Sequence, residues 1–155
     1  MRRFNVFAAA VEHDVEDPPG YRGGGVRLGP RLGAAETGAT LYELPRDQSV
    51  CPYHYEYGNE EWLLVLAGQP TLRHAEGEEV LAPGDLVCFP VGPAGAHKLT
   101  NAGTETVRVL MWSTTHDPSV VVYPDSDKLG VWTGDDRDKL MVRRESVVDY
   151  FDREE

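Results

Sequence analysis

The chain has 155 residues, a length that suits one compact domain with a hydrophobic core. Its formal net charge is −11, from 15 basic and 26 acidic residues, and this excess of acid disfavours nucleic acid and anionic membranes as partners. The 16 glycines and 11 prolines favour many short strands and turns over long helices. We therefore expect a single, mainly β domain over residues 1–155.

The N-terminal segment MRRFNVFAAAVEHD combines two arginines with apolar residues, as a signal peptide does. Its apolar stretch breaks at Glu12, and no run in the chain approaches the roughly 20 apolar residues of a membrane helix. We interpret the segment as a strand of a soluble, cytoplasmic protein. The two cysteines, Cys51 and Cys88, are too few for a disulfide framework, which fits a reducing compartment.

Apolar and alternating runs, separated by turn-forming residues, predict a series of short strands. Apart from its first segment, the region 1–35 is expected to be loosely structured, with a loop at 18–25. The predicted strands cover residues 38–44, 51–57, 61–68, 70–74, 78–82, 85–90, 97–101, 106–114 and 120–124. Any helix is expected in 138–151. So many short strands at spacings of about ten residues are typical of a sandwich or barrel.

Two histidines and two carboxylates stand out in this apolar, strand-rich sequence: His54, Glu56, Glu61 and His97. Because side chains alternate along a strand, His54 and Glu56 should share one face, while Cys51 should point away from them. Imidazole and carboxylate ligands suit Mn, Fe, Ni, Cu or Zn. The residues alone leave an alternative open, since buried His and Glu can satisfy each other by hydrogen bonding without a metal.

The segment around His54 resembles the first motif of the cupin superfamily, G-(x)5-H-x-H-(x)3,4-E-(x)6-G. His54 matches the first histidine, Glu61 matches the glutamate, and Gly68 follows six residues later. Two positions depart from the motif: Glu56 stands where the second histidine belongs, and Gln48 replaces the leading glycine.

The segment 84–101 resembles the second cupin motif, G-(x)5-P-x-G-(x)2-H-(x)3-N. Gly84, Pro90 and Gly92 match it, and Asn101 is correctly spaced from His97. His97 itself comes two residues late, because the loop reads Gly-Pro-Ala-Gly-Ala. The resemblance implies an all-β fold, a small jelly-roll barrel whose motif-bearing core spans about residues 38–115.

In cupins, the residues at these motif positions usually bind one metal ion. Carried over, the ligands are His54, Glu61 and His97, with Glu56 in the place of the second histidine. A divalent ion such as Mn, Fe, Ni or Zn is therefore the implied cofactor. The substitution at position 56 leaves two outcomes open, a site with two carboxylates or a barrel that has lost its metal.

The leading hypothesis is a metalloenzyme of dioxygenase, isomerase or lyase type that acts on a small organic molecule. If Glu56 does not bind the metal, it is a natural general base and thus the catalytic residue. The alternative is a non-catalytic barrel that binds a metabolite or sugar. A metal-free sugar epimerase ranks last, because Arg73 and Lys98 are the only basic residues near the motifs that could bind phosphate.

Two further expectations concern partners and unassigned segments. Cupin-like barrels often pair through edge strands, and we expect a homodimer that uses the N-terminal strand and residues 106–114. The segment YPDSDK (123–128) looks like a polar loop, and its sequence suggests no mechanism. The apolar residues Val147, Val148, Tyr150 and Phe151 could pack on the barrel, on the partner, or remain in an exposed tail.

Overall fold

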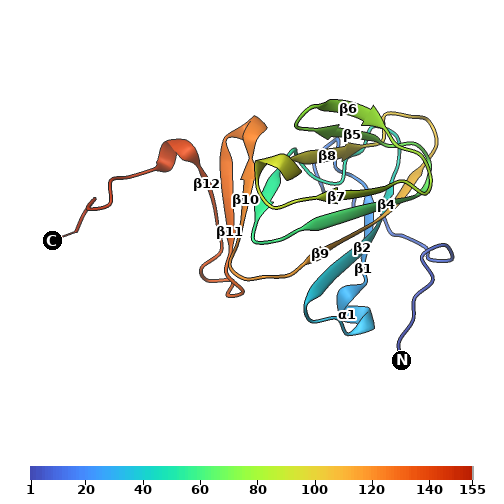
Figure 1. The fold of residues 1–155 in the computed structure, drawn as a ribbon, viewed down its shortest axis with the longest axis horizontal. Helices are drawn as coiled ribbons and strands as arrows, with labels where there is room; N and C mark the ends of the chain where they lie inside the picture. The colour runs from blue at the N-terminus through green and yellow to red at the C-terminus, as the bar shows by residue number, and fades with distance from the viewer. Residues whose placement is uncertain (155) are drawn as a thin grey trace.

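The computed structural model, described here for residues 1–154, consists of antiparallel strands in two layers (Figure 1). One layer is a five-stranded sheet. In spatial order it contains β1 (Gly24–Arg27), β2 (Thr37–Leu44), β9 (Val107–Thr114), β4 (Glu61–Ala67) and β7 (Leu86–Phe89). The layer places the start of β4, which carries Glu61, between β9 and β7.

The other layer contains two smaller sheets. The first has the order β6-β5-β8 and consists of β6 (Gly77–Val80), β5 (Thr71–His74) and β8 (His97–Thr100). The second has the order β12-β11-β10-β3 and consists of β12 (Leu140–Arg143), β11 (Lys128–Trp132), β10 (Ser119–Tyr123) and β3 (Tyr55–Tyr57). An isolated bridge between His54 and His97 joins the two sheets, so both histidines lie at their seam.

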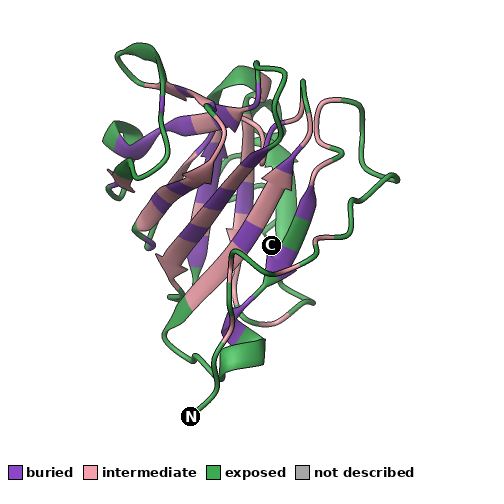
Figure 2. Ribbon diagram, turned by 90° about the vertical axis from the view of Figure 1, so that its right-hand side faces the viewer, coloured by how far each residue is buried: buried purple, intermediate pink, exposed green. Residues whose placement is uncertain are grey.

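Alternating burial along the strands explains why these segments form the two layers. In β9, Val107, Val109 and Met111 are buried while their neighbours are less so, which gives the banded pattern in Figure 2. A buried cluster fills the space between the layers. Its members are Leu44, Leu63, Val65, Leu72, Leu81, Phe89, Leu99, Val107, Val109 and Met111. This core confirms the predicted all-β fold.

Helical structure is limited to short pieces. Over residues 1–154, these are α1 (Gly29–Leu32) and the 3₁₀ turns η1 (Pro93–Gly95), η2 (Pro124–Ser126) and η3 (Arg144–Ser146). In this part of the chain, no helix has both the length and the apolar composition needed to cross a bilayer. In the segment 138–151, where a helix was expected, the structure has strand β12, which extends the sheet by pairing with β11, and only the three-residue 3₁₀ turn η3.

The N-terminal prediction also needs correction. Residues 1–12 form no strand; Phe4, Val6 and Val11 instead pack against a second small cluster that contains Leu41. Arg108 fixes this segment by donating hydrogen bonds to backbone carbonyls of residues 6 and 9. Within the region expected to be loose, residues 24–27 form β1, which pairs with β2. The predicted strand 51–57 is shorter than expected, because only β3 is regular.

Candidate metal centre

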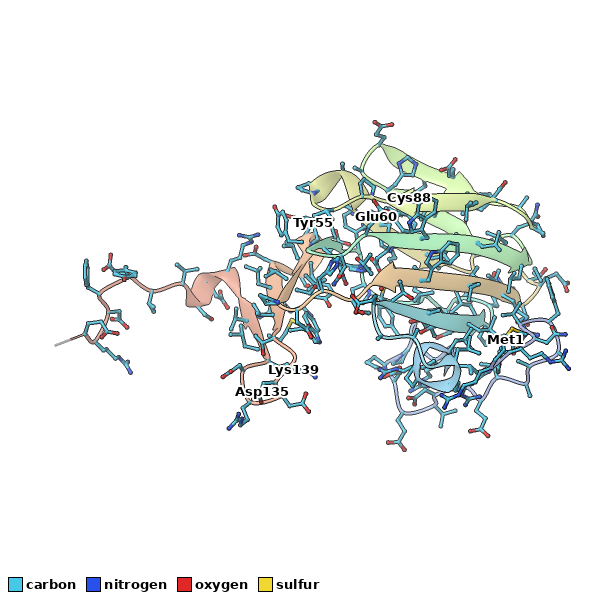
Figure 3. All side chains as sticks on the ribbon, turned by 60° about the horizontal axis from the view of Figure 1, so that its bottom comes forward. Met1, Tyr55, Glu60, Cys88, Asp135 and Lys139 are labelled. Carbon is cyan, nitrogen blue, oxygen red and sulfur yellow. The ribbon has the colours of Figure 1, made fainter. Side chains whose placement is uncertain are left out.

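His54, Glu61 and His97 come together from three elements of the barrel. His54 immediately precedes β3, Glu61 begins β4 and His97 begins β8. The Nε2 atoms of His54 and His97 lie 3.4 Å and 3.7 Å from the same oxygen, Oε2 of Glu61. One ligand atom from each residue falls within a group whose members are all within 4.8 Å of one another. In Figure 3 the labelled Tyr55 and Glu60, each next to one of these ligands in the chain, lie near each other at one side of the barrel.

The backbone orients both imidazoles toward this group. The Nδ1 of His54 lies 3.0 Å from the carbonyl oxygen of Pro52, and the Nδ1 of His97 lies 2.9 Å from that of Gly95. A carbonyl only accepts hydrogen bonds, so each Nδ1 carries a proton and each Nε2 is left to face the group. This second-layer contact is typical of metal-binding histidines.

The surroundings of the His97 Nε2 atom indicate whether the site suits a metal. It is buried and has no hydrogen-bond partner within the described residues, and its ring stacks on Phe89 with centroids 3.6 Å apart. A buried polar atom without a partner costs free energy, and such atoms are rare in folded proteins. Coordination would satisfy this atom, so the donor set of two imidazoles and one carboxylate fits a divalent transition metal.

The charges of the three residues are strongly coupled. Burial alone would lower the pKa of His54, but its hydrogen bonds to Cys51 and Glu61 outweigh burial and raise that pKa to about 11. Burial and the charge of His54 lower the pKa of His97 to about 4. Burial would raise the pKa of Glu61, yet the contacts with both histidines lower it. The carboxylate is therefore anionic, and a metal ion would take the place of the His54 proton.

The long loop before His97 explains why the two-residue offset from the motif is tolerated. Its residues Pro93–Gly95 form the 3₁₀ turn η1, which takes up the extra length. The backbone of Gly95 passes so close to the chain that a Cβ there would lie 1.9 Å from the carbonyl oxygen of Pro90. Only glycine fits at this point, and the same residue supplies the carbonyl that orients His97.

Glu56 is not a member of the clustered group. It lies on β3 opposite Val121, and its Oε2 atom accepts a hydrogen bond from the hydroxyl of Ser119 at 3.5 Å. Burial and the nearby charge of Glu61 raise its pKa. The structure thus brings together three of the four predicted ligands and leaves Glu56 beside them as a partly buried carboxyl.

Two cavities open onto the candidate centre. The first, of about 260 Å³, is lined by His54 and Glu61 together with Tyr42, Met111 and Trp112. The second, of about 290 Å³, is lined by His54 and Glu56. Its other lining residues include Cys51, Asn59, Ser113, Thr114, Thr115, His116, Asp117, Ser119, Val121, Tyr123 and Trp132. The ligands therefore sit between two spaces of a size that can hold a small molecule.

Several of these lining residues were not found from the sequence. Cys51 was predicted to face away from His54, which is wrong: residues 51–53 are not in a strand, and the Cys51 Sγ atom lies 3.4 Å from the His54 Nδ1 atom. Tyr123 stacks on His54 with ring centroids 5.9 Å apart. Ser119, His116 and Tyr123 lie beyond both motifs in the sequence. From the sequence, the segment 123–128 is a polar loop with no assigned role at the site.

Comparisons with known proteins agree with this geometry. Residues 40–113 match the family model described as a cupin domain. A candidate sugar phosphate isomerase from Acidithiobacillus ferrooxidans ATCC 23270 has 29% identity and a TM-score of 0.81, over 93% of this chain and 91% of that chain. No functionally curated protein matches the chain.

Two further solved structures share the fold. One is a sugar phosphate isomerase of the cupin superfamily from Silicibacter pomeroyi DSS-3, with 21% identity and a TM-score of 0.79, over 97% of this chain and 98% of that chain. The other is the polyketide cyclase RemF from Streptomyces resistomycificus, with 23% identity and a TM-score of 0.59, over 75% of this chain and 80% of that chain.

The fold and the clustered side chains define a class, the small antiparallel jelly-roll barrels with a candidate His–Glu–His metal centre between their layers. Within that class, residues 40–113 form a cupin conserved-barrel domain, and the similarity to solved cupin structures over most of the chain supports this assignment. The predicted family and jelly-roll fold are thereby confirmed.

Proposed function

We propose that the protein is a metal-dependent isomerase that acts on a sugar phosphate. One observation supports the metal centre: the buried Nε2 atom of His97 has no hydrogen-bond partner among the described residues and faces the same carboxylate oxygen as His54 does. His54, Glu61 and His97 are the proposed ligands. The substrate class is supported by the similarity to the candidate isomerase from Acidithiobacillus ferrooxidans.

The arrangement of Glu56 supports the isomerase class. Its carboxyl has a raised pKa and lines the same cavity as the proposed ligand His54, so a base would lie next to the Lewis acid that a bound metal would supply. A bound divalent metal would polarise a substrate carbonyl and make the neighbouring C–H bond more acidic. Glu56 would remove that proton and return it to the former carbonyl carbon, while the proton of the neighbouring substrate hydroxyl would move to the former carbonyl oxygen; Ser119 would orient the carboxyl. The electron pair stays within the substrate, so no redox partner is needed.

Metal analysis distinguishes the proposed metal centre from the alternative, a metabolite-binding barrel without a metal. We expect untagged protein to contain near-stoichiometric Mn, Fe, Ni or Zn by inductively coupled plasma mass spectrometry, and His97→Ala to lose it. His74→Ala is the matched control, because His74 lies opposite His97 in the neighbouring strand and outside the clustered group. Protein that arrives empty and takes up none of these ions would contradict the metal centre and leave the binding barrel.

The isomerase part has its own readout. Metal-loaded protein in D₂O should exchange the proton next to the carbonyl of an aldose phosphate, which NMR detects. We expect the exchange to disappear in His97→Ala and to persist in His74→Ala. Bound metal without exchange on any of the common pentose and hexose phosphates would contradict the isomerase and leave the metal centre intact.

A further inference from the structure

A third cavity lies next to the metal centre but outside the two spaces described above. It has a volume of about 580 Å³, and Tyr21, Tyr53, Lys98, Ser126 and Lys128 are among its lining residues. Val50 and Cys51 line both this cavity and the 260 Å³ cavity, so these two residues form a shared wall. We call this third cavity the Lys98–Lys128 pocket.

Two lysines converge on this pocket from different strands. Lys98 lies on β8 and Lys128 begins β11, and neither forms an ion pair with any described residue. Each ammonium instead lies over an aromatic ring: Lys98 Nζ is 5.5 Å from the centroid of Tyr21, and Lys128 Nζ is 5.2 Å from that of Tyr123. Both lysines are half-buried, and Lys98 is close enough to Asp125 for its charge to contribute to the lowered pKa of that carboxyl.

The acidic residues at the pocket do not cancel both lysines. Asp125 is held by Arg73, whose two terminal nitrogens donate hydrogen bonds of 2.6 Å and 2.9 Å to its two oxygens. Asp17 lines the pocket with an exposed side chain and opposes one positive charge. The lining itself holds two lysines and two aspartates, and the region is positive by one charge because Arg73, which lies outside the lining, pairs with Asp125. The same pair ties the 123–128 segment to β5.

The two cavities at the metal centre have the opposite character. Their linings contain Glu56, Glu61 and Asp117, and neither lining includes a lysine or an arginine. A dianionic phosphate would be repelled there unless the metal itself received it. A phosphorylated ligand that uses the metal for its carbonyl therefore needs a cationic site elsewhere, and the adjoining pocket supplies one.

We propose that the Lys98–Lys128 pocket binds the phosphate group of a phosphomonoester. The two ammonium groups would contact the phosphate oxygens, and the rings of Tyr21 and Tyr53 would pack on the carbon skeleton. The identity of the skeleton as a sugar rests on the proposed function, whereas the phosphate site rests on the lysines. The phosphate could belong to the substrate itself or to a separate phosphorylated ligand.

The pocket also contacts the residues that hold a metal ligand. Pro52, which lines the pocket next to the shared wall, accepts the hydrogen bond from His54, and Tyr123 stacks on the same imidazole. The Lys128 Nζ atom lies 5.2 Å from the centroid of the same Tyr123 ring. A phosphate drawn to Lys128 would therefore act on the ring that packs against His54, which links occupancy of the pocket to the position of a proposed ligand.

The test uses calorimetric titration with inorganic phosphate, glucose 6-phosphate and glucose. We expect the wild type to bind both phosphates and not glucose, and Lys98→Met or Lys128→Met to weaken phosphate binding at least fivefold. Methionine keeps the length of the side chain, and circular dichroism checks that each variant is folded. Lys139→Met is the control, because Lys139 pairs with Asp136 away from the pocket.

Equal affinity in the wild type and both methionine variants, or no phosphate binding at all, would overturn the proposal. The variant His97→Ala separates it from the proposed function. If that variant still binds phosphate through the two lysines, the pocket stands whether or not the isomerase does. If binding of glucose 6-phosphate depends on both His97 and the lysines, the phosphate belongs to the substrate. If its binding depends on the lysines alone, the pocket binds a separate phosphorylated ligand.

Discussion

At position 56 a carboxylate replaces the second histidine of the first cupin motif, and its contact with Ser119 places it beside the clustered ligands. Strand alternation predicted that His54 and Glu56 share one face, and both residues line the 290 Å³ cavity. Spacing could not decide between ligand and base, because that choice depends on the partner strand β10. Ser119 belongs to that strand and lies far outside the motif.

The replacement of Glu56 by glutamine separates these two roles. We expect Glu56→Gln to keep its metal and to lose isomerase turnover by about 10²–10⁴-fold, because the amide cannot accept a proton. Metal analysis and the NMR exchange assay measure the two effects on the same sample. Glu60→Gln is the matched control, since Glu60 is exposed and contacts Trp62. Loss of metal in Glu56→Gln would identify Glu56 as a ligand, and unchanged turnover would exclude it as the base.

The same limit of sequence information applies to the other side chains around the site. His54, Glu61 and His97 were found because their spacing is local to the motifs, and the structure clusters these three. Lys128 was not considered for phosphate binding, because only Arg73 and Lys98 lie near the motifs in the chain. The return of the chain through β10 and β11 is what brings Lys128 beside Lys98.

At the level of elements, the central strands were predictable and the peripheral ones were not. The strands β2, β4, β7, β8 and β9 alternate or are continuously apolar, so their sequence periodicity reports their burial. The segment 138–151 contains good helix formers, but Leu140–Arg143 instead completes hydrogen bonds with the open edge of β11. β9 was also expected at an edge, which is wrong because β2 and β4 flank it.

The turn η1 is the element on which the position of His97 depends, and Gly95 is its most constrained residue. We expect Gly95→Ala to destabilise the fold by about 1–3 kcal/mol and to reduce metal uptake, because the new Cβ would collide with the Pro90 carbonyl. Gly103→Ala is the matched control: a Cβ there meets its nearest described atom at 3.5 Å. Urea unfolding and metal analysis give the two readouts. Equal unfolding midpoints for Gly95→Ala and the wild type would contradict the proposed constraint.

On the scale of the whole molecule, the C-terminal residues lie apart from the barrel. Figure 1 shows the chain beyond β12 leading away from both layers. Val147, Val148, Tyr150 and Phe151 are 79%, 67%, 87% and 71% exposed, and all four residues of β12 are exposed at the edge of their sheet. Apolar side chains gathered in this way are typical of an interaction surface rather than of a free tail. The unpaired edge of β12 could continue its sheet into a second copy of the chain.

We therefore expect the homodimer to form through β12 and the C-terminal residues. By light scattering, the full chain should have twice its mass of 17.2 kDa, and a variant that ends at Ser146 should have the mass of one chain. Its melting temperature should stay close to that of the full chain, because residues 147–154 are exposed and leave the core intact. Arg153→Ala, which changes a charged side chain in the same segment, should remain dimeric. A monomeric full chain would contradict the homodimer, and a truncated chain that stays dimeric would place the contact elsewhere.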